Sequence, residues 1–375
     1  ALRTLTGRRP RIAVAGTGGI GPAQIPEASN ALRRLASVEA LDLTQTASIQ
    51  PEIDLVVFLA PRPPSEREAY ALDQHLQRGG KVLLLLEGYA PLPRDPFQRG
   101  PLVDPSWTAT LRSWGLEVGP QLLAVSSRRF TIRGQGGATV QTAYPWFIQP
   151  SGHDNPANPV SGGLPALLLP FACELKPHGP AEVLLRSPPA WAPSGAQRVE
   201  PDAKISLPSD QRAPRTLALG FRKRFASRWA GKPGPAAPSA ASSDPLATPL
   251  QEPTAAGTLL AIGDADFVLG PYLRTSAGNQ DLLLNSAEWC LQGAQLAAVR
   301  ARAQPRPLHG LDARPLGLRP QDLVWGFHLL FPFLLLGAGV GRLSYRKLQA
   351  GRRASRDRAD LAPNPPAPPA DQVPS

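Results

Sequence analysis

The segment from Leu323 to Val340 constrains this chain most, because it reads LVWGFHLLFPFLLLGAGV and is apolar except for one histidine. As a helix these 18 residues extend over about 27 Å, close to the roughly 30 Å hydrocarbon core of a bilayer. Their apolar side chains favour membrane insertion by about 3–6 kcal/mol in total. We therefore predict a transmembrane helix at residues 322–345. The alternative is a buried helix of a soluble core, but no polar face recurs here at helical spacing.

Three residues fit this assignment individually. Trp325 and Tyr345 lie near the two ends of the segment, where amphipathic rings favour the membrane interfaces. Pro332 would break a soluble helix, but prolines are tolerated in spanning helices because neighbouring groups bond the freed carbonyl. The predicted membrane segment thus has the lipid bilayer as its first partner.

The charges that flank the segment predict its orientation. Residues 306–322 hold three cations, whereas six follow the span within fifteen residues: Arg342, Arg346, Lys347, Arg352, Arg353 and Arg356. The positive-inside rule places this side in the cytoplasm. We expect a protein of the bacterial inner membrane, with the bulk of the chain periplasmic or otherwise extracytoplasmic. Residues 301–321 would be a linker, and residues 346–375 a basic, then Pro-rich disordered cytoplasmic tail. The opening ALRTLTGRRP is not a signal peptide, so we expect a signal or spanning helix upstream.

The net charge of +11 does not indicate a nucleic-acid partner. About eight of these charges lie in the terminal flanks, four of them on arginines near the start and the rest after residue 341. The remaining chain is nearly balanced and lacks the clustered basic stripe that phosphate contacts require. The two cysteines, Cys173 and Cys290, lie in apolar settings without metal-type spacing, and we predict buried thiols, with a disulfide as the alternative.

The first 125 residues predict the first part of an α/β domain. Apolar runs indicate strands at 11–16, 40–43, 55–60 and 81–86, and helical patterns fall at 27–36 and 65–78. Ser65 and Glu68 match a capping box, and Gly79-Gly80 ends the helix. Continuous apolar strands that alternate with helices predict a doubly wound, mostly parallel sheet covered on both faces.

The rest of the domain is less regular. A helix at 107–114 leads to strands at 116–118 and 121–125, and residues 126–257 are a Pro-rich, β-containing excursion with a flexible insert at 231–257. Residues 258–300 would complete the sheet, with a strand at 258–262 and a helix at 279–292.

A glycine-rich stretch follows the first strand. Gly16, Gly18 and Gly21, with Asp42 after the next strand, match the dinucleotide fingerprint in letters. That site needs a helix to begin at the second glycine, and Pro22 interrupts the stretch. We predict a permissive turn and no cofactor.

Two polar clusters near the end of the domain are the candidate partner or ligand residues. Asp264 and Asp266 follow the strand at 258–262, where open α/β sheets place their ligands. They could bind a cation or act as acid and base, but with no matching cluster elsewhere we predict that they cap the next turn. Asn279 and Asp281 begin the last helix, and Asn279 is a good N-cap. No metal-type or catalytic spacing accompanies them, so we predict no metal ion and no catalytic residue.

Three blocks of the sequence together resemble a known family. They begin IDLVVFLAPRPPSEREAYALDQ (from Ile53), YPWFIQPSGHDNPANPVSGG (from Tyr144) and LLAIGDADFVLGPYL (from Leu259), and they precede the predicted span. Their order and spacing resemble the GldG-type auxiliary subunit of ABC transport systems, first associated with gliding motility. The resemblance covers most of residues 50–345.

The resemblance implies a glutamine-amidotransferase-like or flavodoxin-like α/β module without a nucleophile, and no cysteine-based elbow occurs here. It also implies that an ABC permease and an ATPase are the partners, and that the domain binds a partner or substrate outside the membrane without catalysis. The alternative is a membrane-anchored α/β sensor of a small ligand, or an enzyme, that uses Asp264 and Asp266.

Overall fold

The computed structural model divides into two compact units, Ala1–Pro305 and Arg306–Ser375. The residues it describes are 8–46, 48–126, 129–133, 139–150, 157–164, 167–200, 208, 210–235, 250, 252–292, 342, 345–347 and 349. All of the fold below belongs to the first unit. The predicted span at 322–345 falls outside the described residues except for Arg342 and Tyr345, which are helical. Among the helices that are described, none has the length and apolarity needed to cross a bilayer.

An eight-stranded sheet forms the centre of the first unit, in the order β2-β1-β3-β4-β17-β16-β14-β8. Its parallel part consists of β2 (Ser37–Ala40), β1 (Arg11–Gly16), β3 (Leu55–Ala60), β4 (Lys81–Leu86) and β17 (Gly257–Ile262). The antiparallel part consists of β16 (Ala213–Lys223), β14 (Glu182–Trp191) and β8 (Ala124–Val125). The parallel strands thus follow the 2-1-3-4-5 order of flavodoxin-like sheets. The predicted mostly parallel α/β fold is confirmed.

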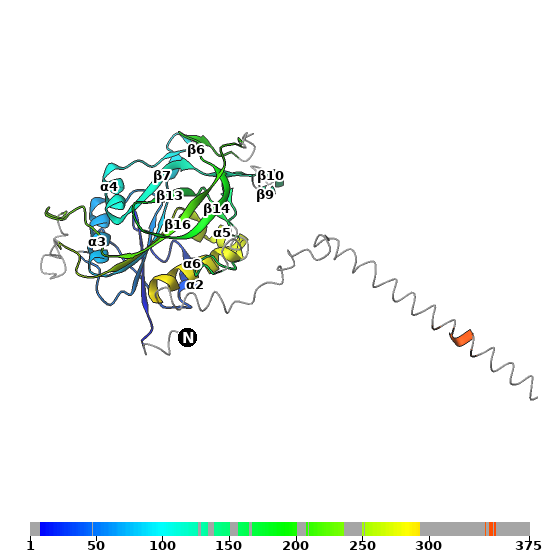
Figure 1. Cartoon of the computed structure of the whole chain (residues 1–375), viewed down its shortest axis with the longest axis horizontal. Helices are drawn as coiled ribbons and strands as arrows, with labels where there is room; N and C mark the ends of the chain where they lie inside the picture. The colour runs from blue at the N-terminus through cyan, green and yellow to red at the C-terminus, as the bar shows by residue number, and fades with distance from the viewer. Residues whose placement is uncertain are drawn as a thin grey trace, which may run out of the picture. The chain divides into compact units, whose positions relative to one another are not determined.

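The central strands are buried on both faces because their side chains alternate between two cores. Ile12, Leu55 and Leu83 belong to the core on one face, and Ala13, Val56 and Val82 to the core on the other. Helices α2 (Pro26–Leu32), α5 (Gly270–Thr275) and α6 (Ala277–Gln292) lie on the first face, and α3 (Glu66–Gln77) and α4 (Pro105–Trp114) on the second (Figure 1). This double burial explains why β1, β3 and β4 read as continuous apolar runs, and their predicted bounds are confirmed.

The helix ends on the second face follow their sequence signals. Ser65 and Glu68 form the predicted capping box at the start of α3, and Gly79 follows the helix at φ 84°. Asp104 caps α4 by accepting a hydrogen bond from the Trp107 N–H at 2.7 Å. Gly115 ends this helix at φ 88°, a left-handed conformation that other residues adopt only with strain.

Two predicted elements near the start were placed wrongly. The second strand occupies Ser37–Ala40 instead of 40–43, because its pairing with β1 begins at Ser37 and an ion pair joins Arg11 to Glu39 at 2.9 Å. Leu43 is buried in the following turn, so its apolar side chain indicated burial without a strand. Helix α2 ends at Leu32 instead of residue 36, since the chain tightens into i to i−3 hydrogen bonds at residues 34 and 35.

The segment 126–257, predicted as an excursion, contributes two long strands to the main sheet. β16 lies between β17 and β14, so this part of the chain adds two of the three antiparallel strands. Of the predicted flexible insert, residues 236–249 and 251 lie outside the described residues. Its two ends lie along α3, where Gly234 approaches Tyr70 and the Thr254 N–H donates to the Gln77 carbonyl at 3.0 Å.

Smaller sheets accompany the central sheet. They comprise β5 (Tyr89–Leu92), β6 (Asp95–Pro101) and β15 (Gln197–Arg198); β7 (Leu116–Leu122) with β13 (Cys173–Pro177); β11 (Phe147–Ile148) with β12 (Leu169–Pro170); and β9 (Arg129–Arg133) with β10 (Thr139–Ala143). Cys173 and Cys290 are buried free thiols, as predicted, and burial raises the pKa of Cys290 to about 12.

Candidate functional site

Glu87 and Asp264 lie side by side at the carboxyl edge of the parallel sheet. Strands β4 and β17 are paired up to Leu85 and Ile262, and Glu87 and Asp264 follow two residues further along each strand. Residues in register on neighbouring strands are about 4.8 Å apart and point to the same face. The Ala265 N–H donates a 2.7 Å hydrogen bond to Glu87 Oε1. The segments that follow β4 and β17 therefore stay together beyond the last residue pair of the two strands.

Each of these two carboxylates has one satisfied oxygen. Asp264 Oδ1 accepts from the Phe267 N–H at 2.8 Å, so Asp264 caps the short 3₁₀ helix η3 (Asp266–Val268). The predicted capping of this turn is therefore confirmed. Glu87 Oε2 and Asp264 Oδ2 are buried and have no hydrogen-bond partner among the described residues. An unpaired buried oxygen of this kind is costly.

Burial governs the charge state of this pair. Glu87 is 8% exposed and Asp264 is fully buried. Loss of hydration raises the pKa of Glu87 well above its ordinary value, and the nearby Asp266 carboxylate raises it further. Burial likewise raises the pKa of Asp264, and Glu87 adds to the effect. Each carboxylate therefore opposes ionisation of its neighbour.

Asp266 is the carboxylate of this group that reaches the surface. Its side chain is 22% exposed, and Arg99 Nη2 on β6 lies 3.8 Å from Asp266 Oδ2. The Arg99 guanidinium also lies 3.7 Å from the centre of the Phe171 ring, within reach of a cation–π interaction. Burial raises the pKa of Asp266, whereas Arg99 lowers it.

Aromatic side chains surround Arg99 and Asp266. Phe147 packs edge-on against Tyr144, Phe171 and Tyr272, with ring centres 4.6, 5.8 and 5.8 Å apart. Burial raises the pKa of Tyr272 to about 12, so its hydroxyl is neutral. The site is thus a buried acidic pair beside one largely buried ion pair and an aromatic cluster.

Asn279 joins this region but does not cap a helix. It is fully buried in the first turn of α6, which begins at Ala277. Its amide binds both backbone groups of Leu168, at 2.9 and 2.7 Å, and donates to the Phe267 carbonyl at 3.3 Å. The N-cap prediction was wrong, because the amide is used to fasten two loops to the helix. Asp281 is half-buried and lies about 200° further around α6.

The glycine-rich stretch forms a turn. Helix α2 begins at Pro26, so no helix N-terminus meets Gly18, as a pyrophosphate site would require. The Arg62 guanidinium lies against Gly18, and Asp42 Oδ1 accepts from the N–H and hydroxyl of Thr44 at 2.9 and 2.6 Å. The polar groups of the fingerprint are therefore engaged in local structure.

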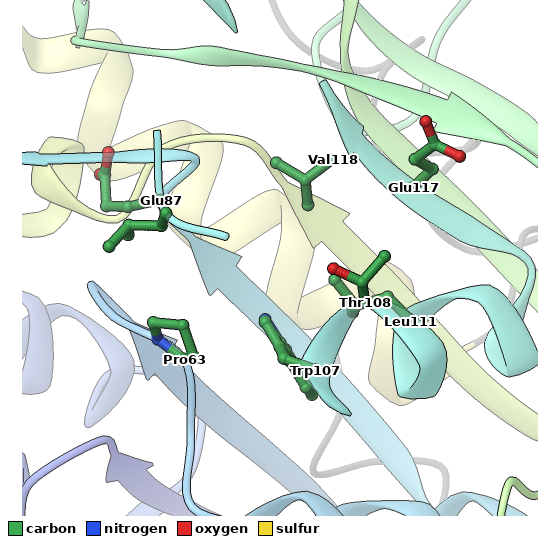
Figure 2. Close-up of a pocket in the computed structure, with 8 residues that line it drawn as sticks. Pro63, Glu87, Trp107, Thr108, Leu111, Glu117 and Val118 are labelled. Atoms are coloured by element: carbon green, nitrogen blue, oxygen red, sulfur yellow. The ribbon is translucent and has the colours of Figure 1, made fainter. Parts of the chain in front are cut away.

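A small pocket opens at the sheet edge on the face that carries α4. It has a volume of about 40 Å³ and is lined by Pro63, Glu87, Leu102, Trp107, Thr108, Leu111, Glu117 and Val118. Figure 2 shows the Glu87 carboxylate pointing away from Trp107 and Thr108. A space of this size holds about one water molecule and is far smaller than a site for a typical small-molecule ligand.

The sequence analysis missed Glu87, the partner of Asp264. The usable signal was its position directly after the strand at 81–86, but the strand that carries Asp264 lies far away in the sequence. Only the pairing of β4 with β17 brings the two together. Within the described residues, no three His, Cys, Asp or Glu side chains are grouped so as to hold a metal ion.

The sequence of this α/β domain matches one known family of proteins. The sequence model of the family described as an ABC-type uncharacterized transport system, an auxiliary family, matches residues 9–286. This chain belongs to that family, in agreement with its resemblance to GldG-type subunits. The family identifies an auxiliary component of an ABC transport system.

Other comparisons are more distant. No curated protein matches the chain. Among solved structures, the mmIFT52 N-terminal domain is 13% identical, with 75% of this chain and 98% of that chain covered and a TM-score of 0.43. ThuA-like proteins from Bacteroides uniformis and Parabacteroides merdae are 12% and 13% identical, over 78% and 76% of this chain and 96% and 91% of theirs, with TM-scores of 0.38 and 0.34. All three TM-scores are below 0.5, so the functional assignment rests on the family match.

Proposed function

We propose that this protein is a membrane-anchored, non-catalytic auxiliary subunit of an ABC transport system. In this proposal its α/β domain binds a partner or substrate beside the permease and the ATPase. The single observation that carries it is the family match over residues 9–286. The predicted helix at 322–345 supplies the anchor. The bulk of the chain would lie outside the cytoplasm, since the cations gather after that segment.

The arrangement of the carboxyl edge supports a binding role over a catalytic one. Asp264 is fully buried and caps η3, so its carboxylate does not reach a substrate at the surface. Asn279 is also buried and occupied by backbone groups. Of the candidate residues at this edge, Asp266 has surface exposure, and it is paired with Arg99.

The first experiment is a mild-detergent purification of the tagged full-length protein from its native membrane, with the recovered proteins identified by mass spectrometry. We expect a polytopic permease and a nucleotide-binding subunit in stoichiometric amounts. Recovery of the protein alone, under conditions that keep other ABC complexes intact, would contradict the proposal.

The anchor can be tested separately with two double variants. Leu334→Arg/Leu335→Arg places two charges at the centre of the predicted span, at a cost of about 2.5–3.5 kcal/mol each for insertion. We expect this variant to leave the membrane fraction, whereas Leu334→Ile/Leu335→Ile should remain in it. Membrane recovery of the arginine variant would contradict anchoring by this segment.

A second candidate is a sensor of a small ligand, or an enzyme, that uses Asp264 and Asp266. It is favoured by the raised pKa values at the sheet edge, because such shifts concentrate at functional sites. The test is thermal unfolding of Asp266→Asn against a panel of small molecules. A ligand-dependent shift that the variant loses with its fold intact would favour this candidate; no shift in the unsubstituted protein would count against it.

A further inference from the structure

We infer that Glu87 and Asp264 hold one shared proton at neutral pH, which makes the carboxyl edge of the sheet a proton-binding site. In this arrangement the protonated carboxyl group donates an O–H hydrogen bond to the ionised one. The pair then carries one negative charge instead of two. This inference is independent of the proposal that the protein serves a transporter.

The hydrogen-bond pattern is the first argument. Both carboxylates accept one backbone N–H from the same turn, Glu87 from Ala265 and Asp264 from Phe267. The Asp266 N–H also lowers the pKa of both groups, but Glu87 Oε2 and Asp264 Oδ2 are buried without a hydrogen-bond partner among the described residues. Two ionised carboxylates offer only acceptors, whereas one added proton supplies the missing donor. A single proton thus satisfies both remaining oxygens.

The placement of the two side chains is the second argument. They continue the β4–β17 register at the same level, and the strand residues two positions before them, Leu85 and Ile262, face the same core. The face shared by Leu85 and Ile262 carries α5 and α6. Glu87 also lines the pocket, but its carboxylate points away from Trp107 and Thr108 (Figure 2) and accepts from the Ala265 N–H in the turn that Asp264 begins.

The surrounding groups do not neutralise two charges. Four titratable or charged groups face the pair: Asp266 on η3, Arg99 on β6, Tyr272 on α5 and Cys173 on β13. Arg99 is matched by Asp266. Burial raises the pKa of Tyr272 and of Cys173, so both are neutral. A bound metal ion is not indicated either, since the described residues contain no suitable group of ligands.

The proton couples folding to pH. Because the folded pair keeps a proton that the unfolded carboxyl groups release near their ordinary pKa values, stability is greatest at acid pH and falls as pH rises. Between the ordinary carboxyl pKa values and the raised pKa of the folded pair, unfolding releases this proton, and the folding equilibrium constant should decrease by up to about tenfold per pH unit. Above the raised pKa this decline ends.

The test compares the pH dependence of urea unfolding for the full chain with that of Glu87→Gln and Asp264→Asn. Both amides keep the backbone bond and supply a permanent donor to the other carboxylate. We expect either variant to flatten the decline that runs from about pH 5 to the pH at which the folded pair ionises. Glu117→Gln, on the other face, should leave that decline unchanged. An unchanged decline in both amide variants would overturn the inference.

Infrared spectroscopy provides a second readout. We expect a carboxylic-acid carbonyl band at pH 7 in the unsubstituted protein that weakens in either amide variant. If one variant fails to fold, the other decides, since each removes the pair. If neither folds, a band in the unsubstituted protein that disappears at the pH where its decline in stability ends supports the shared proton, and the absence of any such band overturns it.

Discussion

Two buried acidic sites on opposite faces of the sheet show how differently this fold treats a carboxylate. Asp73 on α3 is fully buried and accepts four hydrogen bonds. The donors are Trp114 Nε1 at 3.0 Å, the Ser227 hydroxyl at 2.6 Å, Gln77 Nε2 at 2.7 Å and Gln74 Nε2 at 3.2 Å. Glu87 and Asp264 are also buried, but each has one oxygen without a hydrogen-bond partner among the described residues.

The difference separates a structural carboxylate from one that needs an additional partner. Burial raises the pKa of Asp73, but all four donors lower it. The network joins α3, α4 and the segment after β16. It therefore holds the elements of the second face together. At the carboxyl edge the neighbouring acids raise the pKa values further. Asp73 is thus stabilised by its donors, whereas the Glu87–Asp264 pair needs an added donor. Mutation and pH can separate these two cases.

The largest effect is expected from Asp73→Ala. The substitution leaves four donors without their acceptor in a buried region, and we expect a loss of about 3 kcal/mol in the free energy of unfolding. Urea unfolding of the full chain at pH 7 measures it. Glu39→Ala, which breaks an exposed ion pair with Arg11, is the control and should cost less than about 1 kcal/mol. Equal losses in the two variants would show that the Asp73 network contributes no more to the free energy of unfolding than an exposed ion pair does.

Ser227→Ala removes one of the four donors and should cost about 1 kcal/mol at pH 7. The Ser227 hydroxyl bonds to the ionised form of Asp73, so its removal raises the pKa of that carboxyl. The loss should therefore shrink at acid pH, where Asp73 is protonated. Ser113→Ala, which removes a hydroxyl that donates to a helix carbonyl, should show no such pH dependence in urea unfolding. A loss that is equal at pH 3 and pH 7 would contradict this account.

The sequence predicted the second face better than the carboxyl edge, and the reason is physical. The capping box of α3 and the continuous strands are local signals, so their residues could be identified without the fold. The pairing of Glu87 with Asp264 depends on two strands that meet only in the folded sheet. The amide of Asn279 likewise binds Leu168 across a long sequence separation. Local sequence rules predicted that Asn279 caps a helix, whereas in the fold its amide binds backbone groups of other segments.

Glu117 offers the opposite pH behaviour and sharpens the contrast. His178 Nε2 lies 2.8 Å from Glu117 Oε2 and lowers the pKa of this carboxyl, with help from Arg112. A lowered pKa gives stability above the unfolded value that disappears as pH falls. Glu117→Gln should cost under about 1 kcal/mol at pH 7 and nothing at about pH 3. Unfolding curves at the two pH values measure it, with Glu182→Gln as an exposed control. A cost that grows at acid pH would contradict the assignment.

The smallest expected effect at pH 7 comes from Arg99→Gln, although its position makes it informative. The Arg99–Asp266 pair is 3.8 Å long, and loss of the cation over Phe171 costs about 0.5–1 kcal/mol. Arg99 lowers the pKa of both Glu87 and Asp266. Without it these carboxyl groups keep their protons to higher pH, so the upper end of the decline in stability should move upward by less than about one pH unit.

Arg99→Lys is the matched control for this shift because it keeps the positive charge beside Asp266. Its decline in urea-measured stability should stay at the pH of the unsubstituted protein, even if the poorer stacking on Phe171 lowers stability throughout. A similar upward shift in both variants would mean that the guanidinium acts through shape and not charge. A downward shift in Arg99→Gln would contradict the proposed electrostatics of the whole edge, since removal of a nearby cation can only favour the protonated carboxyl.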